Sequence, residues 1–184
     1  MRRAMKRFLY LVIIWSSVFA TAEVITMDLN TATDMALNPV TYSATYGNGY
    51  YDCTDVWDSG MCQYIYTNDA RFMLSHMPSR NSYGGMSWEG FTLSQVSQDT
   101  ANVFGCVTNG GIGGVGTPYV IGYFSAWVTE SQGYSSNIIL FDQAYYPEHA
   151  YVCQNSNTKE AIAHGGVFNS RAFTEKDTLA LIVN

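Results

Sequence analysis

The chain has 184 residues, and nine basic residues against fifteen acidic ones give it a formal net charge of −6 at pH 7. An acidic surface repels phosphate backbones and anionic headgroups, which argues against nucleic acid and anionic lipid partners. A chain of this length suits a single domain with a substantial core, and its fourteen Tyr, nine Phe and four Trp favour strands over helices.

The N-terminal segment has the organisation of a secretory signal peptide. Four basic residues precede an apolar stretch from Phe8 to Phe19, and Ala20-Thr21-Ala22 has the small-x-small form of a cleavage site. The apolar stretch is well short of the roughly 20 residues that cross a bilayer. We expect residues 1–22 to be removed with four of the nine basic residues. Residues 23–184 then form one exported β-sandwich domain with a net charge of −10.

No cysteine precedes Cys53, so the sequence offers no site at which a lipoprotein signal could be cut and acylated. The expected location of the exported domain is the periplasm, the cell surface or the extracellular space.

Short runs of β-forming residues, bounded by turn residues, follow one another from Thr41 onward. Regular short strands with little helix between them are typical of antiparallel sheets packed as a sandwich or jelly roll. Residues 23–39 form a leader that can add one edge strand, and Met77-Pro78 is expected to end a strand. The expected strands lie in TYSATY (41–46), QYIY (63–66), RFMLSH (71–76), SWEGFTLS (87–94), VFGCV (103–107), PYVIGYFSAWV (118–128), NIILFD (137–142), AYVCQ (150–154) and TLALIV (178–183).

One short helix is expected late in the chain. Asn157 can cap it, Glu160 at the third helical position completes a capping box, and Gly165-Gly166 supplies a left-handed stop. A helix of about two turns cannot build a core alone. We therefore expect it to cover an open end or edge of the sandwich.

The glycine run GIGGVG, residues 111–116, matches the letters of the dinucleotide-binding fingerprint but not its context. That fingerprint needs a helix whose N-terminus faces the pyrophosphate, whereas Thr117-Pro118 leads into a β-branched and aromatic run. We interpret the glycines as a strand connection. His76, His149 and His164 lie far apart in the sequence, without a nucleophile elbow or an H-E-x-x-H helix. The sequence therefore favours a non-enzymatic protein, with glycoside hydrolysis by paired carboxylates as a less favoured alternative.

Asp52, Asp55 and Asp58 recur at every third residue. Carboxylates gathered in a loop can coordinate Ca²⁺, although this spacing differs from that of an EF-hand loop. A calcium site and a solvated acidic turn both remain open.

The four cysteines, Cys53, Cys62, Cys106 and Cys153, include no C-x-x-C arrangement, which argues against a structural zinc site. In an oxidising compartment four cysteines allow three pairings. A bond between Cys53 and Cys62 would close a short loop, and four separate buried thiols are the alternative.

Exposed aromatic side chains are the candidate ligand-binding residues. A flat ring can stack on a sugar or a planar cofactor while its polar edge forms hydrogen bonds. Trp57 in the acidic loop and Tyr134 in SQGYSSN are expected to be exposed, followed by Tyr145 and Tyr146 before Pro147.

The segment from Tyr83 to Asp99, YGGMSWEGFTLSQVSQD, resembles a domain-of-unknown-function family of exported Bacteroidetes proteins. That family is marked by an aromatic-Trp-x-Gly-Phe-x-x-Ser segment followed closely by an Asp. A second likeness begins at PEHAYVCQN, and the two together span about Tyr46 to Val183. The matching positions are Trp88, Gly90, Phe91, Ser94 and Asp99 in the first segment and Gly165, Phe168, Phe173, Asp177 and Leu179 to Ile182 in the second.

The resemblance implies a jelly-roll β-sandwich and, as in some family members, binding of cobalamin (vitamin B12) at the outer surface for delivery to an outer-membrane transport partner. Cobalamin is therefore the first expected ligand, and a carbohydrate-binding or adhesion module is the alternative. Cys153-Gln154 stands where the family has Thr-Asn, and the family's common lipoprotein Cys is absent. Family members continue for several strands beyond the last apolar one, so the resemblance implies a chain shortened at its C-terminus, with sheet edges that promote association.

Overall fold

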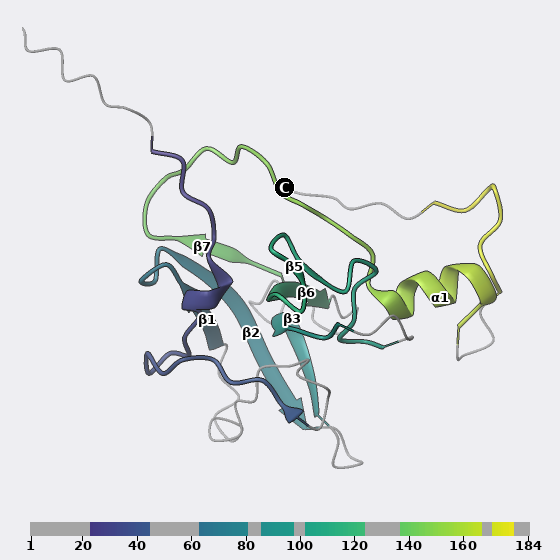
Figure 1. Ribbon diagram of the computed structural model, residues 1–184, viewed down its shortest axis with the longest axis horizontal. Helices are drawn as coiled ribbons and strands as arrows, with labels where there is room; N and C mark the ends of the chain where they lie inside the picture. Colours follow the sequence, from purple (N-terminus) through teal and green to yellow (C-terminus); the bar gives the residue numbers. More distant parts are fainter. Residues whose placement is uncertain are drawn as a thin grey trace, which may run out of the picture.

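Open antiparallel sheets and a single α-helix make up the regular structure of the computed structural model, which describes residues 23–44, 63–80, 86–97, 102–123, 137–166 and 171–178 (Figure 1). The predicted all-β, sandwich-like class is therefore confirmed. The larger sheet contains β1 (Gln63–Thr67), β2 (Phe72–Arg80), β3 (Met86–Ser94), β6 (Tyr119–Tyr123) and β7 (Ile139–Phe141), and the smaller one contains β4 (Gly110–Gly111) and β5 (Gly114–Val115). Five of the expected runs thus contain strands of the larger sheet.

The larger sheet branches at the middle of β2. β1 pairs with one edge of β2 from Phe72 to His76, and on the opposite edge β7 pairs with the first three residues of β2. β3 pairs with that opposite edge of β2 along residues His76 to Arg80. From Gly90 onward, β3 pairs with β6 instead. Gly90 has a φ of 82°, in the left-handed region that glycine adopts without a steric penalty. This residue lets β3 bend away and leaves room for β7.

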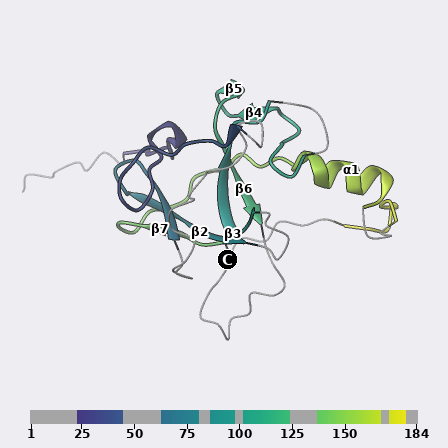
Figure 2. The same cartoon turned by 90° about the horizontal axis from the view of Figure 1, so that it is seen from below.

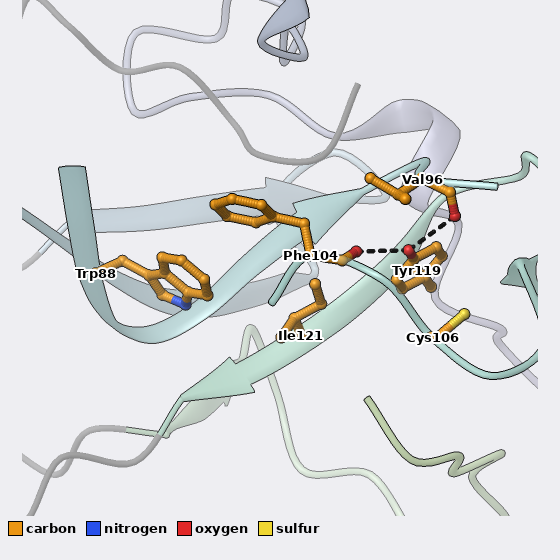
Figure 3. Close-up of a cluster of buried hydrophobic side chains, with 6 residues drawn as sticks. All are labelled: Trp88, Val96, Phe104, Cys106, Tyr119 and Ile121. Carbon is orange, nitrogen blue, oxygen red and sulfur yellow. Dashed lines mark hydrogen bonds between the residues drawn. The ribbon is translucent and has the colours of Figure 1, made fainter. Parts of the chain in front are cut away.

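Alternating side chains cover both faces of the β3–β6 pair. On one face, Leu93 packs with Ile65, Leu74 and Ala32, and the N-terminal leader covers this cluster. On the other face, the chain between β3 and β6 folds over the sheet (Figure 3). The buried residues of that second cluster are Trp88, Val96, Phe104, Cys106, Tyr119 and Ile121.

A buried hydrogen-bond network joins the second cluster to the chain that covers it. The Tyr119 hydroxyl lies 2.6 Å from the carbonyl oxygen of Phe104 and 3.0 Å from that of Val96 (Figure 3). Ser94 Oγ lies 2.6 Å from the same Phe104 oxygen and also accepts the N–H of Val96. Burial raises the pKa of Tyr119 to about 12, so its hydroxyl remains a proton donor.

The N-terminal leader packs against the sheet without adding the expected edge strand. A 3-10 turn, Leu29–Thr31, begins at Asp28, whose carboxylate accepts the N–H of Asn30. Thr33 then exchanges two backbone hydrogen bonds of 2.9 Å with Tyr66 of β1. Where a full edge strand was predicted, the described leader forms one bridge to β1.

Two further strand predictions are wrong, those for residues 103–107 and 150–154. The Asn102 side chain accepts a backbone N–H two residues further on, at 2.8 Å, which starts a turn where the β-forming residues predicted a strand. The two segments meet at a single bridge, between Cys106 and Asn155. Residues 150–154 are extended but belong to none of the described strands.

The first and last expected strands fall partly outside the described residues. Residues 41–44, the described part of the TYSATY run, form no strand. Of the final run, only Thr178 is described.

The predicted end of a strand at Met77-Pro78 is wrong, because β2 continues to Arg80. Proline is tolerated in a strand where its missing N–H is not needed for a ladder hydrogen bond. The described pairing of β2 with β1 ends at His76, two residues before Pro78, which still pairs with Trp88 of β3.

The glycine run forms the smaller sheet and connects directly to β6, as expected of a strand connection. Gly114 and Gly116 have φ values of 104° and 76°, which side chains rarely adopt. A strand follows the run in place of the helix that a dinucleotide-binding fingerprint requires.

The expected helix is present as α1 (Ser156–His164), but its cap is Asn155 and not Asn157. Asn155 Oδ1 accepts the N–H groups of Asn157 and Thr158 at 2.9 and 3.3 Å. The predicted stop is confirmed by Gly165, whose φ is 85°.

The helix does not cover a sheet edge as expected. Ser156 is its one buried residue, and both views place α1 and β7 at opposite ends of the molecule (Figures 1 and 2). Residues 142–155 run between these two ends.

Candidate ligand-binding site

Of the four aromatic residues predicted to bind ligand, Tyr145 and Tyr146 are described, and they follow β7 directly. Trp57 and Tyr134 lie outside the described residues, as do the three aspartates of the predicted calcium site, Asp52, Asp55 and Asp58. The structure therefore describes the surroundings of the two adjacent tyrosines only.

Three aromatic rings meet where β7 pairs with β2, and we call Phe72, Phe141 and Tyr145 the aromatic cluster. The antiparallel register places Phe141 opposite Phe72, with ring centroids 5.7 Å apart in an edge-to-face arrangement. The Tyr145 ring stacks on Phe72 at 6.0 Å and is tilted against Phe141 at 5.8 Å. These separations are typical of favourable aromatic pairs. The rings therefore hold one another in place.

Asp142 fixes the chain between β7 and the tyrosines. Its backbone N–H donates to the carbonyl oxygen of Arg71 at 3.1 Å, and its Oδ1 accepts the Tyr145 hydroxyl at 2.8 Å. The hydrogen bond to this carboxylate raises the pKa of Tyr145. The bend after β7 thus folds the Tyr145 ring back onto the cluster.

The two tyrosines have different environments, which the sequence alone could not distinguish. Tyr145 is half-buried, whereas Tyr146 has a relative exposure of 102 %. Phe141 is 45 % exposed, while Phe72 beneath it is buried at 6 %. The arrangement offers exposed rings supported by a buried one, next to a carboxylate that accepts hydrogen bonds. Such a surface can stack on a flat ligand and accept hydrogen bonds from its edge.

Sequence reasoning missed Phe141, Asp142 and Phe72 as parts of this site. Phe141 and Asp142 stand in a run expected to form a strand, and Phe72 in another. Their proximity depends on the pairing of two strands far apart in the sequence. The one available signal was the acidic residue three positions before a tyrosine, a spacing that also suits an ordinary turn.

In the described part of the chain, no three His, Cys, Asp or Glu side chains gather as a metal site would require. The described helix also lacks the length and apolar character needed to cross a membrane. His76 is fully buried, and its Nδ1 donates to the Phe91 carbonyl oxygen at 2.7 Å at the branch of the sheet. Its role is therefore in the core.

Comparison with known proteins gives no match to this chain among protein-family models, curated proteins or solved structures.

Proposed function

We propose that this protein is an exported, non-enzymatic ligand-binding module that holds a flat-faced ligand against the exposed rings around β7. The observation that supports the proposal is the aromatic cluster, in which Phe141 and Tyr145 are braced by buried Phe72. Rings fixed before binding lose little conformational entropy when a ligand stacks on them. In this proposal Tyr146, which follows Tyr145 and is the most exposed aromatic residue described, extends the stacking surface.

The first proposed ligand is cobalamin, on the basis of the family resemblance of the sequence. Its corrin ring presents a broad face for stacking and peripheral amides whose N–H groups can donate to Asp142. In this proposal the module delivers cobalamin, chemically unaltered, to an outer-membrane transport partner. The signal-peptide organisation of residues 1–22 supports a location outside the cytoplasm.

A carbohydrate is the second candidate ligand, and the same carboxylate beside the exposed rings supports it. One oxygen of the Asp142 carboxylate accepts the Tyr145 hydroxyl. The carboxylate can accept further hydrogen bonds, and it lies beside the exposed rings. Sugars offer apolar ring faces for stacking together with hydroxyl groups that donate to carboxylates. The same site geometry thus serves a glycan or a corrin.

The test is equilibrium binding of the purified chain to cyanocobalamin, followed by gel filtration with detection of the visible absorbance of the corrin. Co-elution of colour with protein is expected, and Tyr146→Ala should weaken binding about 5- to 30-fold, because a stacking contact of this kind contributes about 1–2 kcal/mol. A glycan array with the same two proteins tests the second candidate.

Tyr151→Ala is the matched control, because Tyr151 is also highly exposed but its ring contacts His149 outside the aromatic cluster. This variant should bind like the unaltered chain. Colour that elutes apart from the protein, with no signal on the glycan array, would contradict both ligands. Equal loss of binding in the two variants would contradict the site.

A further inference from the structure

Two cysteines that are distant in the sequence, Cys106 and Cys153, come together beside the start of α1. Thr108 Oγ1 lies 3.2 Å from the sulfur of Cys106 and 3.8 Å from the sulfur of Cys153. Both sulfurs thus contact the same hydroxyl group. Cys106 is buried, whereas Cys153 is exposed to solvent.

The backbone explains why these side chains meet. Val107 N–H donates to the Gln154 carbonyl oxygen at 3.1 Å, and Cys106 forms an antiparallel bridge with Asn155. Opposed residues of an antiparallel pair share a face, and so do residues two positions apart on one strand. Cys153, two positions before Asn155, therefore lies diagonally across from Cys106 on the same face, where side chains remain within reach.

We propose that Cys106 and Cys153 form a disulfide bond when the protein meets a disulfide oxidant such as oxidised glutathione. Of the three pairings that four cysteines allow, this one leaves Cys53 to pair with Cys62. The bond would join the turn before the glycine run to the residues that lead into α1.

The exchange proceeds in two steps. Exposed Cys153 loses its proton and attacks one sulfur of oxidised glutathione, which releases one glutathione thiolate and leaves a mixed disulfide. The Cys106 thiolate then attacks the Cys153 sulfur and displaces the second glutathione. The protein loses two protons and two electrons, and the oxidant is reduced to two thiols.

Exposure suits Cys153 for the attack on the bulky oxidant, and the surroundings of Cys106 suit it for the second step. Burial acts to raise the pKa of Cys106, but hydrogen bonds, that from the Thr108 side chain foremost, outweigh it, so the pKa lies below its usual value. Burial raises the pKa of Cys153, and a negative charge on Cys106 raises it further. Cys106 therefore loses its proton more readily than Cys153, which suits it to complete the bond.

The spacing of basic residues allows tryptic digestion to distinguish the possible cysteine pairings. The sequence has no Lys or Arg between Arg80 and Lys159, so Cys106 and Cys153 fall in one peptide, residues 81–159, while Cys53 and Cys62 fall in the peptide that ends at Arg71. The full chain is incubated with oxidised glutathione, blocked with N-ethylmaleimide under denaturing conditions, digested without reductant and analysed by mass spectrometry.

The expected result is an unalkylated peptide 81–159 lighter by two hydrogen atoms, which takes up two alkyl groups after reduction. Cys153→Ser should leave one maleimide-reactive thiol in that peptide, and Cys53→Ser should leave its bond intact. Alkylation of both Cys106 and Cys153 in the oxidised chain would overturn the proposal, as would a peptide joined to the one ending at Arg71. The test on the unaltered chain does not depend on either variant folding.

Discussion

The Tyr119 hydroxyl lies within hydrogen-bond distance of two backbone carbonyl oxygens at the centre of the second core cluster, those of Val96 and Phe104. Tyr119→Phe keeps the ring but leaves the oxygens of Val96 and Phe104 without this donor. We expect the free energy of unfolding to fall by about 1–3 kcal/mol, because a buried acceptor that loses its partner bears the cost of desolvation.

Urea denaturation followed by tryptophan fluorescence measures this loss. Tyr151→Phe removes the hydroxyl from an exposed tyrosine, and its effect should stay within about 0.5 kcal/mol. Equal stability of the two variants would show that Ser94 alone satisfies the Phe104 oxygen.

His76 should make stability depend on pH. Burial lowers its pKa from 6.5 to about 4, against the opposing effect of its hydrogen bond to Phe91. As the pH falls below 6.5, the unfolded chain binds a proton at this position and the folded protein does not, so stability present above pH 6.5 is progressively lost down to about pH 4. The loss is roughly 3 kcal/mol over this window.

Denaturation series at several pH values test this effect by comparison with His76→Asn, which places an amide donor near the position of Nδ1. The variant should be less stable at pH 7 but should show a smaller loss on acidification. Parallel curves for the two proteins would contradict a neutral His76 in the folded state.

Three residues of the first segment that carries the family resemblance have structural roles. Trp88 is buried and stacks on Phe104, Gly90 adopts a positive φ where β3 bends, and Ser94 bonds to the covering chain. The sequence could identify these residues as unusual. It could not show that their roles are structural, because each role depends on residues that come later in the chain.

At the level of elements, the start of α1 is determined by tertiary contacts. The Asn155 amide donates to the carbonyl oxygens of Val103 and Gly105 at 2.6 and 2.9 Å while its oxygen caps the helix. Asn155→Ala should lower stability by about 2 kcal/mol or more, since it removes a cap and two further hydrogen bonds.

Asn157→Ala provides the matched control, because Asn157 is an exposed residue of the first turn that contributes its backbone N–H to the cap. Its replacement should change the denaturation midpoint little. A larger loss of stability on replacing Asn157 than on replacing Asn155 would instead support Asn157 as the cap, as the sequence predicted.

Local patterns predicted the elements that depend on local chemistry. Short runs of β-forming residues bounded by turn residues located the strands of the larger sheet, and Gly165 marked the end of the helix. The strand expected at residues 103–107 was wrong because the Asn102 side chain competes for the backbone, and Pro78 was misread because the sequence does not show which edge of β2 is paired. The first error thus has a local cause, whereas the second depends on pairing between distant segments.

At the level of the whole molecule, the sequence indicated the class of fold and two of the residues at the candidate site. The remainder of that site follows from the register of β7 on β2, which sets Phe141 against Phe72. No short-range pattern fixes the pairing of strands that are separated by β3 and β6.

The short ladder of β7 has a consequence for motion. Three residue pairs hold this strand to β2, and all three of its side chains are at least 37 % exposed, so few backbone hydrogen bonds and little burial of its own side chains oppose its release. Segments of this kind open by local unfolding while the rest of a protein stays folded. Backbone amides of β7 should therefore exchange with deuterium faster than those of β3 at Leu93, and a ligand seated on Phe141 should slow the former and leave the latter unchanged.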